Sequence, residues 1–260
     1  MLLAVDVGNS QTHLGVFSRD ELAHEWRIST QEARTADELA LIFGDFLALA
    51  GLSFDNEITG VAISSVVPRV TQELRSMTLQ YFGFSAVVVE PGTKTGVAVA
   101  TENPRQVGAD RIVNAAAARA LFPGEPVVVV DLGTAIKVDA VSASGEFLGG
   151  AIAPGIETGA TALFQSTAQL PRVELVAPAH AIGKNTVTAM QSGIFFGTAA
   201  LVDGLVEQVT KELGGAARVV ATGGHAGAVI EHSNRIEQVD PLLKLRGLRL
   251  IFELNTSRPT

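Results

Sequence analysis

Two aspartates, each at the end of an apolar stretch and each followed two residues later by glycine, are the side chains best placed to do chemistry. Asp6 lies in VDVGNSQTHLGVF (residues 4–16) and Asp131 lies in VVVVDLGTAIKVDAV (residues 127–141). Both segments read as a strand, Asp-x-Gly, a polar turn and a second strand. Because an unpaired carboxylate costs several kcal/mol to bury, its position after a buried strand indicates a function.

The chemistry that such a turn favours is phosphate binding. A turn that contains glycine between two strands presents backbone N–H groups, and phosphate oxygens bind in such a concavity. A neighbouring carboxylate suits the site if a cation lies between the negative groups, as Mg²⁺ does when it bridges carboxylate, water and phosphate oxygens. One turn alone is equally compatible with an ordinary hairpin in which Asn9 adopts a left-handed conformation. Two matching turns favour a nucleotide site that is held from two sides.

Hydrophobic patterning predicts the elements that position these turns. Alternating or continuous apolar runs predict strands at residues 2–7, 13–18, 24–29, 58–66, 85–90, 127–133, 136–143, 146–154, 218–222 and 235–240. Amphipathic patterning predicts helices at residues 35–52, 68–83, 108–122, 186–213, 225–232 and 241–255. The middle of the helix at 186–213 is small or apolar nearly all round, which indicates burial between domains or between subunits.

The two halves of the chain open in the same way, with three strands before the first helix. This indicates duplication, although Asp-x-Gly is a common turn formula and coincidence is the alternative. We expect two α/β domains, at residues 1–121 and 122–260, with the segment FPGEP (residues 122–126) as the hinge. The last helix of the chain is expected to pack back on the N-terminal domain.

The composition excludes several classes of function. The chain has 260 residues, 27 acidic against 19 basic residues, a formal net charge of -8 and no cysteine. This balance gives no electrostatic footprint for nucleic acid or for an anionic membrane, and disulfides and thiolate catalysis are excluded. The first residues read as a buried strand rather than a signal peptide, and no run of about 18 apolar residues is uninterrupted. We expect a soluble cytoplasmic protein with no nucleic-acid or membrane partner.

Five motifs follow one another along most of the chain: DVGNS (6–10), ENPRQVGADR (102–111), DLGTA (131–135), FLGGAIAPGI (147–156) and IGKNTVTAMQSG (182–193). In this combination and order the sequence resembles the type III pantothenate kinases of the acetate and sugar kinase, hexokinase and actin superfamily. The resemblance implies an α/β fold of two RNase-H-like domains around a nucleotide cleft. It also implies ATP-dependent phosphorylation of pantothenate, the first step of coenzyme A biosynthesis, by a homodimer that uses Mg²⁺ and a monovalent cation, K⁺ or NH₄⁺.

The resemblance also implies roles for individual residues. Asp110 is the general base that takes the proton of the pantothenate hydroxyl. Asp131 binds the monovalent cation. The residues implied to contact ATP phosphates are Asp6, Gly8, Asn9, Ser10, His13 and Thr134. The residues implied to bind pantothenate are Thr101, Gly108, Ala109, Asp110, Arg111 and Thr186, the last from the neighbouring subunit or near that interface.

The residues themselves leave ordinary structural roles open. Asp110 opens a helix and is also a candidate cap, a role worth about 1 kcal/mol. Arg111 suits either an exposed ion pair or a bidentate contact with a substrate carboxylate. Asn114 lies on the same helical face as these two residues and is expected to orient one of them. Thr186 is also a candidate N-cap, and Gly223 with Gly224 resembles a turn that superfamily members place beside adenosine.

Three positions depart from the family pattern. Thr101 stands where many members have Tyr, Lys137 stands where Thr is common, and His13 occupies a variable position that is Lys in some members. Lys137 is interpreted as a partner for a phosphate, for Asp131 or for Asp139, or else as a solvated strand residue. These departures leave two other hypotheses open: a catalytically weak member with a regulatory ligand- or partner-binding role, and a kinase for another small hydroxy compound.

Other catalytic classes find no support in the motifs. The histidines show no metal-ligand spacing such as HExxH, and the chain has no GxxxxGK[ST] motif. A histidine-held catalytic metal and a Walker-type kinase are therefore disfavoured.

Overall fold

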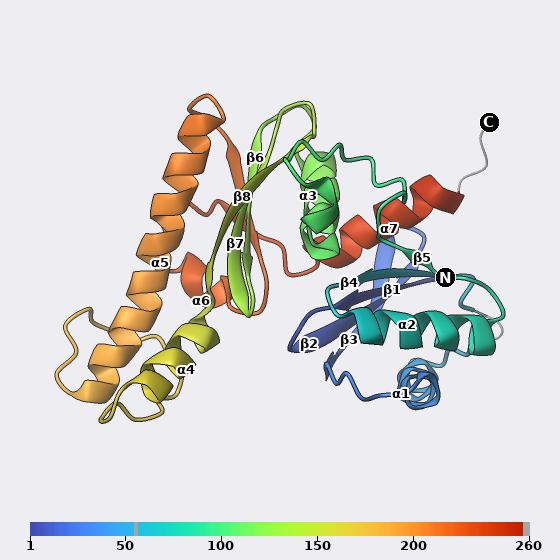
Figure 1. Ribbon diagram of the computed structural model, residues 1–260, viewed down its shortest axis with the longest axis horizontal. Helices are drawn as coiled ribbons and strands as arrows, with labels where there is room; N and C mark the ends of the chain where they lie inside the picture. The colour runs from blue at the N-terminus through green and yellow to red at the C-terminus, as the bar shows by residue number, and fades with distance from the viewer. Residues whose placement is uncertain (55–56, 257–260) are drawn as a thin grey trace. The chain divides into compact units, whose positions relative to one another are not determined.

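The computed structural model describes residues 1–54 and 57–256, which form two compact units (Figure 1). Of these residues, unit 1 comprises 1–54, 57–98, 102–117 and 243–256, and unit 2 comprises 99–101 and 118–242. Each unit contains one five-stranded mixed sheet. The predicted α/β class is therefore confirmed, while the expected boundary at residues 121 and 122 stays a prediction.

The sheet of unit 1 has the strand order β3-β2-β1-β4-β5. Its strands are β1 (Leu2–Val7), β2 (Gln11–Ser18), β3 (Glu21–Ser29), β4 (Gly60–Ser65) and β5 (Val87–Val88). The first three strands pair antiparallel, and β4 pairs parallel with β1. Since β1 and β4 are parallel, their carboxyl ends lie at one edge of the sheet, where the first Asp-x-Gly turn begins.

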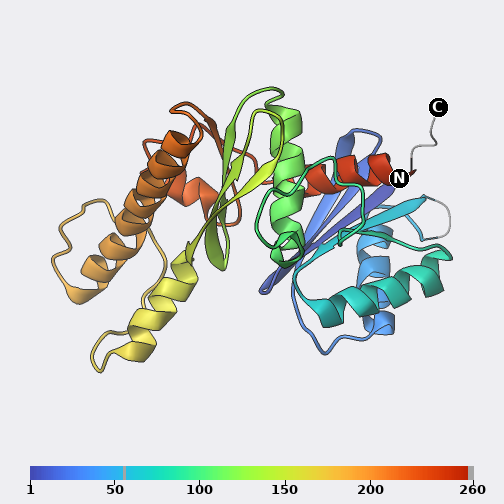
Figure 2. The ribbon, with the colours of Figure 1, turned by 45° about the horizontal axis from the view of Figure 1, so that its top comes forward.

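Helices cover both faces of this sheet, as Figure 2 shows. One face packs against α1 (Ala36–Leu49) and α2 (Pro68–Met77), which is followed by a π-helical turn at Thr78–Phe82. Helix α1 begins after Thr35, and a capping box with Glu38 satisfies its first N–H groups. Helix α7 (Leu243–Thr256), at the other end of the chain, contacts β1, β2 and β4 on the opposite face.

Two glycines allow this close approach of α7. An added Cβ at Gly60 in β4 would meet the ring of Phe252, and one at Gly15 in β2 would meet the side chain of Leu245. The last helix therefore packs on the first sheet, although the rest of the second half of the chain separates them in sequence.

The sheet of unit 2 has the order β10-β9-β6-β7-β8. Its strands are β6 (Val127–Leu132), β7 (Ala135–Val141), β8 (Phe147–Pro154), β9 (Arg218–Thr222) and β10 (Gln238–Val239). Strands β6, β7 and β8 pair antiparallel, and β9 pairs parallel with β6, so the arrangement matches that of unit 1. This repeated order supports the duplication predicted from the two openings.

One face of the second sheet forms a core with three helices: α4 (Ile156–Ser166), α5 (Thr186–Glu212) and α6 (Ala226–Ile230). Helix α5 is long and apolar enough to cross a membrane by length and composition, with a mean hydropathy of 1.3 over its most apolar window. Its residues Phe195, Ala199, Val202 and Val206 pack into this core. We therefore interpret α5 as a core helix. Helix α3 (Ala109–Leu121) belongs to unit 1 up to Ala117 and to unit 2 beyond it.

Candidate active site

The first Asp-x-Gly turn is closed by its own backbone. The N–H of Gly8 donates to the carbonyl of Gln11 over 2.9 Å. The hydroxyl of Thr30, beyond the end of β3, donates to the carbonyl of Gly8 over 2.8 Å, and the N–H of Thr30 donates to the carbonyl of Ser10 over 3.0 Å. The side chains of Asn9 and Ser10 are exposed. The turn is thus fixed from behind, and its tip faces solvent.

Asp6 lies one residue before the end of β1, and its side chain is 8% exposed. Leu3, Val5 and Val7 point into the core of unit 1, so the alternation of the strand turns Asp6 to the face that α7 covers. There Nζ of Lys244 lies 3.7 Å from Oδ2 of Asp6. Lys244 was missed by the sequence reasoning.

His13 lies directly opposite Asp6 in the β1–β2 ladder. Its Nε2 donates to the carboxylate of Glu25 over 2.7 Å. Burial, the largest effect, lowers the pKa of the His13 imidazole, although the hydrogen bond with Glu25 acts in the opposite direction. A neutral imidazole at pH 7 contributes a hydrogen-bonding group to this turn rather than a positive charge.

The GADR segment lies at the same edge of the first sheet as the Asp6 turn. An added Cβ at Gly108 would lie 3.6 Å from a methyl group of Val66, and the N–H of Val66 donates to the carbonyl of Val7 over 3.1 Å. The start of α3 is therefore next to the carboxyl ends of β1 and β4. Asp110 is 7% exposed and accepts the N–H of Arg111 over 3.0 Å.

Contrary to expectation, Asn114 does not orient Asp110 or Arg111 through a hydrogen bond. Its side chain is fully buried, and neither its amide nitrogen nor its amide oxygen has a hydrogen-bond partner among the described residues. The predicted orientation of Asp110 or Arg111 by this amide is therefore wrong. Helical spacing places the residues on one face, but it does not ensure that their polar atoms reach one another.

The second turn is held by two contacts from the start of α4. The N–H of Gly155 and the hydroxyl of Thr158 both donate to the carbonyl of Thr134, over 3.1 and 2.7 Å. An added Cβ at Gly155 would overlap the carbonyls of Gly133 and Thr134. The motif FLGGAIAPGI thus ends in a glycine that lets the backbone approach the turn. In both units, a threonine hydroxyl fixes one carbonyl of the turn.

Asp131 is 1% exposed and pairs with a lysine of the same sheet. Nζ of Lys137 donates to Oδ2 of Asp131 over 3.2 Å, and the two residues are opposite each other in the β6–β7 ladder. Of the interpretations open for Lys137, the ion pair with Asp131 is the one observed. The alternative of a solvated strand residue is wrong, because the Lys137 side chain is 19% exposed.

The Gly223–Gly224 turn packs on the end of β6. Gly223 has φ +98°, and an added Cβ would lie 2.5 Å from the carbonyl oxygen of Leu132. The N–H of His225 donates to the same oxygen over 3.3 Å. This turn therefore belongs to the second phosphate turn's immediate surroundings, a closeness that a Gly-Gly pair in sequence does not reveal.

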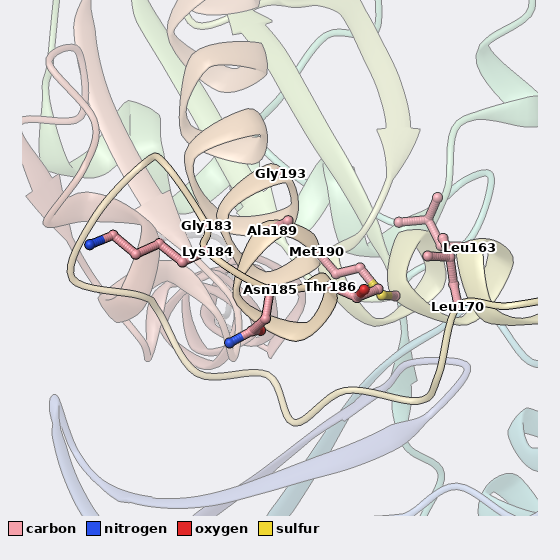
Figure 3. Close-up of a pocket in the computed structure, with 9 residues that line it drawn as sticks. All are labelled: Leu163, Leu170, Gly183, Lys184, Asn185, Thr186, Ala189, Met190 and Gly193. Atoms are coloured by element: carbon pink, nitrogen blue, oxygen red, sulfur yellow. The ribbon is translucent and has the colours of Figure 1, made fainter.

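Thr186 lies elsewhere in unit 2, at the start of α5. It follows the N-cap Asn185, whose side chain accepts the N–H of Thr188 over 2.9 Å, so the cap expected at Thr186 is one residue earlier. Thr186 lines an open pocket of about 610 Å³ between α4 and α5 (Figure 3), and no residue of the second turn lines this pocket. The lining residues are Leu163, Leu170, Gly183, Lys184, Asn185, Thr186, Ala189, Met190 and Gly193.

Thr101 is half-buried beside β8. Its methyl group would lie 3.8 Å from a Cβ added at Gly149, and its hydroxyl has no hydrogen-bond partner among the described residues. Ala100, the residue before it, donates its N–H to the carbonyl of Phe147 over 2.9 Å.

The structure thus groups the candidate residues in three places, apart from Thr101, which lies beside β8. In unit 1, the Asp6 turn, His13 and the GADR segment share one sheet edge. In unit 2, the Asp131 turn lies with Lys137 and Gly223, while Thr186 lines a separate pocket. Among residues 1–54 and 57–256, no group of three or more His, Asp or Glu side chains could hold a metal ion by itself.

Each unit has a five-stranded sheet of the same order with an Asp-x-Gly turn after its first strand, an architecture of the actin and sugar-kinase type. The solved structures agree in fold. A protein described as a Baf family transcriptional activator from Campylobacter jejuni matches with a TM-score of 0.61 and 22% identity, over 97% of this chain and 98% of its own. An inorganic polyphosphate/ATP-glucomannokinase from Arthrobacter sp. strain KM matches with a TM-score of 0.50 and 16% identity, over 96% of each chain.

Sequence comparison narrows this class to one family. The family model of type III pantothenate kinase matches residues 2–208. The type III pantothenate kinase of Moorella thermoacetica is 50% identical over 98% of this chain and 100% of its own. That of Streptomyces griseus is 50% identical over 99% of this chain and 100% of its own. The chain belongs to the type III pantothenate kinase family.

Proposed function

We propose that this chain transfers the terminal phosphoryl group of ATP to the hydroxyl of pantothenate, the first step of coenzyme A biosynthesis. The observation that carries the proposal is the position of the GADR segment in unit 1. It places a buried carboxylate and an arginine at the sheet edge where the Asp6 turn presents its exposed tip. Membership of the family supports the choice of substrate.

In the proposed reaction, the pantothenate hydroxyl oxygen bonds to the γ-phosphorus of ATP while the bond to the leaving ADP oxygen breaks. The carboxylate of Asp110 accepts the hydroxyl proton. Its contact with the N–H of Arg111 fixes the carboxylate at the start of α3. Because phosphoryl transfer has a loose transition state, positioning and charge neutralisation contribute more to the rate than the base does.

Arg111 is the proposed partner of the pantothenate carboxylate. A guanidinium offers a planar pair of N–H donors that matches a carboxylate. Gly108 leaves room for the neighbouring Asp110 carboxylate, since an added Cβ there would lie 2.6 Å from its Oδ1. Asp110 and Arg111 are neighbours in sequence. The start of α3 is therefore proposed to contact both the reacting hydroxyl and the carboxylate of pantothenate. Thr101 and Thr186 are proposed to contact other parts of the substrate.

Each unit has a turn that is proposed to bind phosphate. Asp6, Gly8, Asn9, Ser10 and His13 serve from unit 1, and Thr134 serves from unit 2. Mg²⁺, when bound, would neutralise charge on the ATP phosphates. The resemblance also implies a monovalent cation at Asp131. That carboxylate already has a positive partner, because the ammonium of Lys137 lies 3.2 Å from it.

The protein is further proposed to be a soluble cytoplasmic homodimer. The surface around the Thr186 pocket supports a partner subunit, since it exposes several large apolar side chains: Leu163, Val176, Ile182 and Val187. A second copy that covers these residues would remove apolar area from water. The net charge of -8 gives no reason to expect nucleic-acid binding.

One assay tests the proposal. Purified protein is incubated with ATP and Mg²⁺, with and without pantothenate, and ADP formation is measured beside the variant Asp110→Asn. We expect pantothenate-dependent turnover by the wild type and a loss of about 10²-fold in kcat for the variant, at the lower end of general-base effects. Binding of both ligands without turnover would favour a regulatory role, and turnover with another alcohol alone would favour a different kinase.

A further inference from the structure

The negative charge at the end of β6 is balanced by a side chain of the same sheet. Lys137 donates from Nζ to Oδ2 of Asp131 over 3.2 Å, and the pair is fixed by the backbone because the two residues oppose each other in the β6–β7 ladder. Asp131 is almost fully buried and the Lys137 side chain is mostly buried. This ion pair is therefore shielded from solvent and from salt to a large degree.

The alternation of the strands explains why the pair forms. Val130 and Leu132 of β6 and Ile136 and Val138 of β7 point into the core of unit 2. Asp131 and Lys137 therefore share the opposite face of the sheet.

Asp139 lies two residues further along β7 on that face and is also buried. The Lys137 ammonium thus pairs with Asp131 on a sheet face that also carries the carboxylate of Asp139.

The chemistry of this ammonium is that of a monovalent cation. It carries one positive charge, like K⁺, and it is an alkyl derivative of NH₄⁺ that the strand holds in place. A second cation bound by Asp131 would lie within a few ångströms of the ammonium, and like charges so close disfavour each other. The residues present thus do not suit an added K⁺ at Asp131.

We propose that the Lys137 ammonium takes the place of the monovalent cation at Asp131, so that nucleotide binding and phosphoryl transfer do not depend on added K⁺ or NH₄⁺. The inference deepens the proposed kinase function and rests on it for the second of these two effects. Lys137 acts through Asp131 on the second phosphate turn and is a positioning residue.

The first experiment uses the wild-type protein. The affinity for MgADP is measured by calorimetry in chloride salts of K⁺, NH₄⁺, Na⁺ and tetramethylammonium at equal ionic strength, and pantothenate-dependent ADP formation is measured in the same buffers. We expect both quantities to agree within about twofold across the four salts. A tenfold or larger requirement for K⁺ or NH₄⁺ in either quantity would overturn the inference.

The second experiment creates the missing site. Lys137→Thr removes the ammonium, and we expect MgADP to bind at least tenfold more weakly in Na⁺ or tetramethylammonium, with recovery in K⁺ or NH₄⁺. The matched control is Lys211→Thr, which breaks an exposed ion pair of α5 with Glu207. This control should respond to the salts as the wild type does. Cation-independent MgADP binding by Lys137→Thr, as tight as in the wild type, would contradict the inference.

If Lys137→Thr does not fold, a direct measurement of cation binding to the wild type tests whether Asp131 holds a monovalent cation. Tl⁺ mimics K⁺, and its NMR line broadens when it exchanges with a protein site. We expect no saturable Tl⁺ binding to the wild type with MgADP present, and saturable binding to a folded Lys137→Thr. Saturable binding to the wild type that Asp131→Asn abolishes would overturn the inference. A wild type without turnover in any salt would instead count against the proposed kinase function, because the MgADP and Tl⁺ measurements do not require turnover.

Discussion

Nζ of Lys244 lies 3.7 Å from Oδ2 of Asp6, although one residue is near the end of the chain and the other is near its start. Lys244 is the second residue of α7, where the positive end of the helix dipole disfavours a cation. The buried carboxylate of Asp6 offsets this cost. Each Asp-x-Gly turn therefore has an ammonium beside its aspartate: Lys244 in unit 1 and Lys137 in unit 2.

Replacement of Lys244 by glutamine should weaken the first turn. The variant Lys244→Gln leaves the carboxylate of Asp6 buried without this cation. We expect it to lower the free energy of unfolding by about 1 to 2 kcal/mol, less than the cost of breaking a fully buried pair, because the lysine is partly exposed. Urea unfolding at pH 7 measures the change.

The matched control for this prediction keeps the charge. Lys244→Arg should retain most of the unfolding free energy, since a guanidinium also pairs with the carboxylate. Equal losses for the glutamine and arginine variants would show that packing of the lysine stem, rather than its charge, stabilises the turn.

Replacement of Arg111 should act on the acid end of the substrate. A lysine keeps the charge but loses the planar pair of donors, so Arg111→Lys should raise the KM for pantothenate at least tenfold and change kcat by less than threefold. Steady-state kinetics with varied pantothenate measure both quantities.

A neutral substrate separates this role from a general effect on the active site. Pantothenyl alcohol lacks the carboxylate, so kcat/KM for this compound should be about the same in the wild type and in Arg111→Lys. A similar loss for both substrates would argue against recognition of the carboxylate by Arg111.

Most of the fold could be predicted because local patterning and tertiary structure agree. The strands before each Asp-x-Gly turn are continuous apolar runs, and all of them form as expected. The capping box of α1 begins at the predicted Thr35. The strand expected at residues 85–90 is reduced to Val87–Val88, which pair with Ala62 and Ile63 of β4.

The site could be predicted only in part, because several of its contacts join distant segments. The turns at Asp6 and Asp131 can be predicted from the sequence, because each has a carboxylate at the end of an apolar run. Nothing local shows that Lys244 reaches Asp6. The one available signal was a lysine at a helix start, where the helix dipole disfavours it. The roles assigned to individual residues stay predictions until the kinetic experiments are done.

The turn at Gly223 should be intolerant of any side chain. Gly223 has φ +98°, and a Cβ would lie 2.5 Å from the carbonyl oxygen of Leu132. We expect Gly223→Ala to lower the free energy of unfolding by about 2 to 4 kcal/mol, the sum of the left-handed backbone cost and the steric overlap. Gly124→Ala is the control, because Gly124 has φ +81° with nothing within 4 Å of its Cβ position. It should cost about 1 to 2 kcal/mol, and an equal loss in both variants would exclude the overlap as the cause.

The stability of unit 1 should depend on the protonation of His13. Burial lowers the pKa of this imidazole below 6.5, so the unfolded chain binds the proton more readily than the folded chain does. The free energy of unfolding should therefore fall as the pH is lowered through 6.5 towards the folded pKa of His13. Below both pKa values this part of the loss is complete.

The test compares the pH dependence of unfolding in two variants. His13→Gln cannot take up the proton, so its free energy of unfolding should fall less steeply than that of the wild type when the pH is lowered from 7 to 5. His180→Gln, at an exposed position, is the control and should follow the wild type. Urea unfolding at half-unit pH steps provides the curves. Parallel curves for His13→Gln and the wild type would mean that the hydrogen bond and the charge of Glu25, which raise the pKa of His13, compensate for burial, and the imidazole would then have no part in the acid sensitivity of the fold.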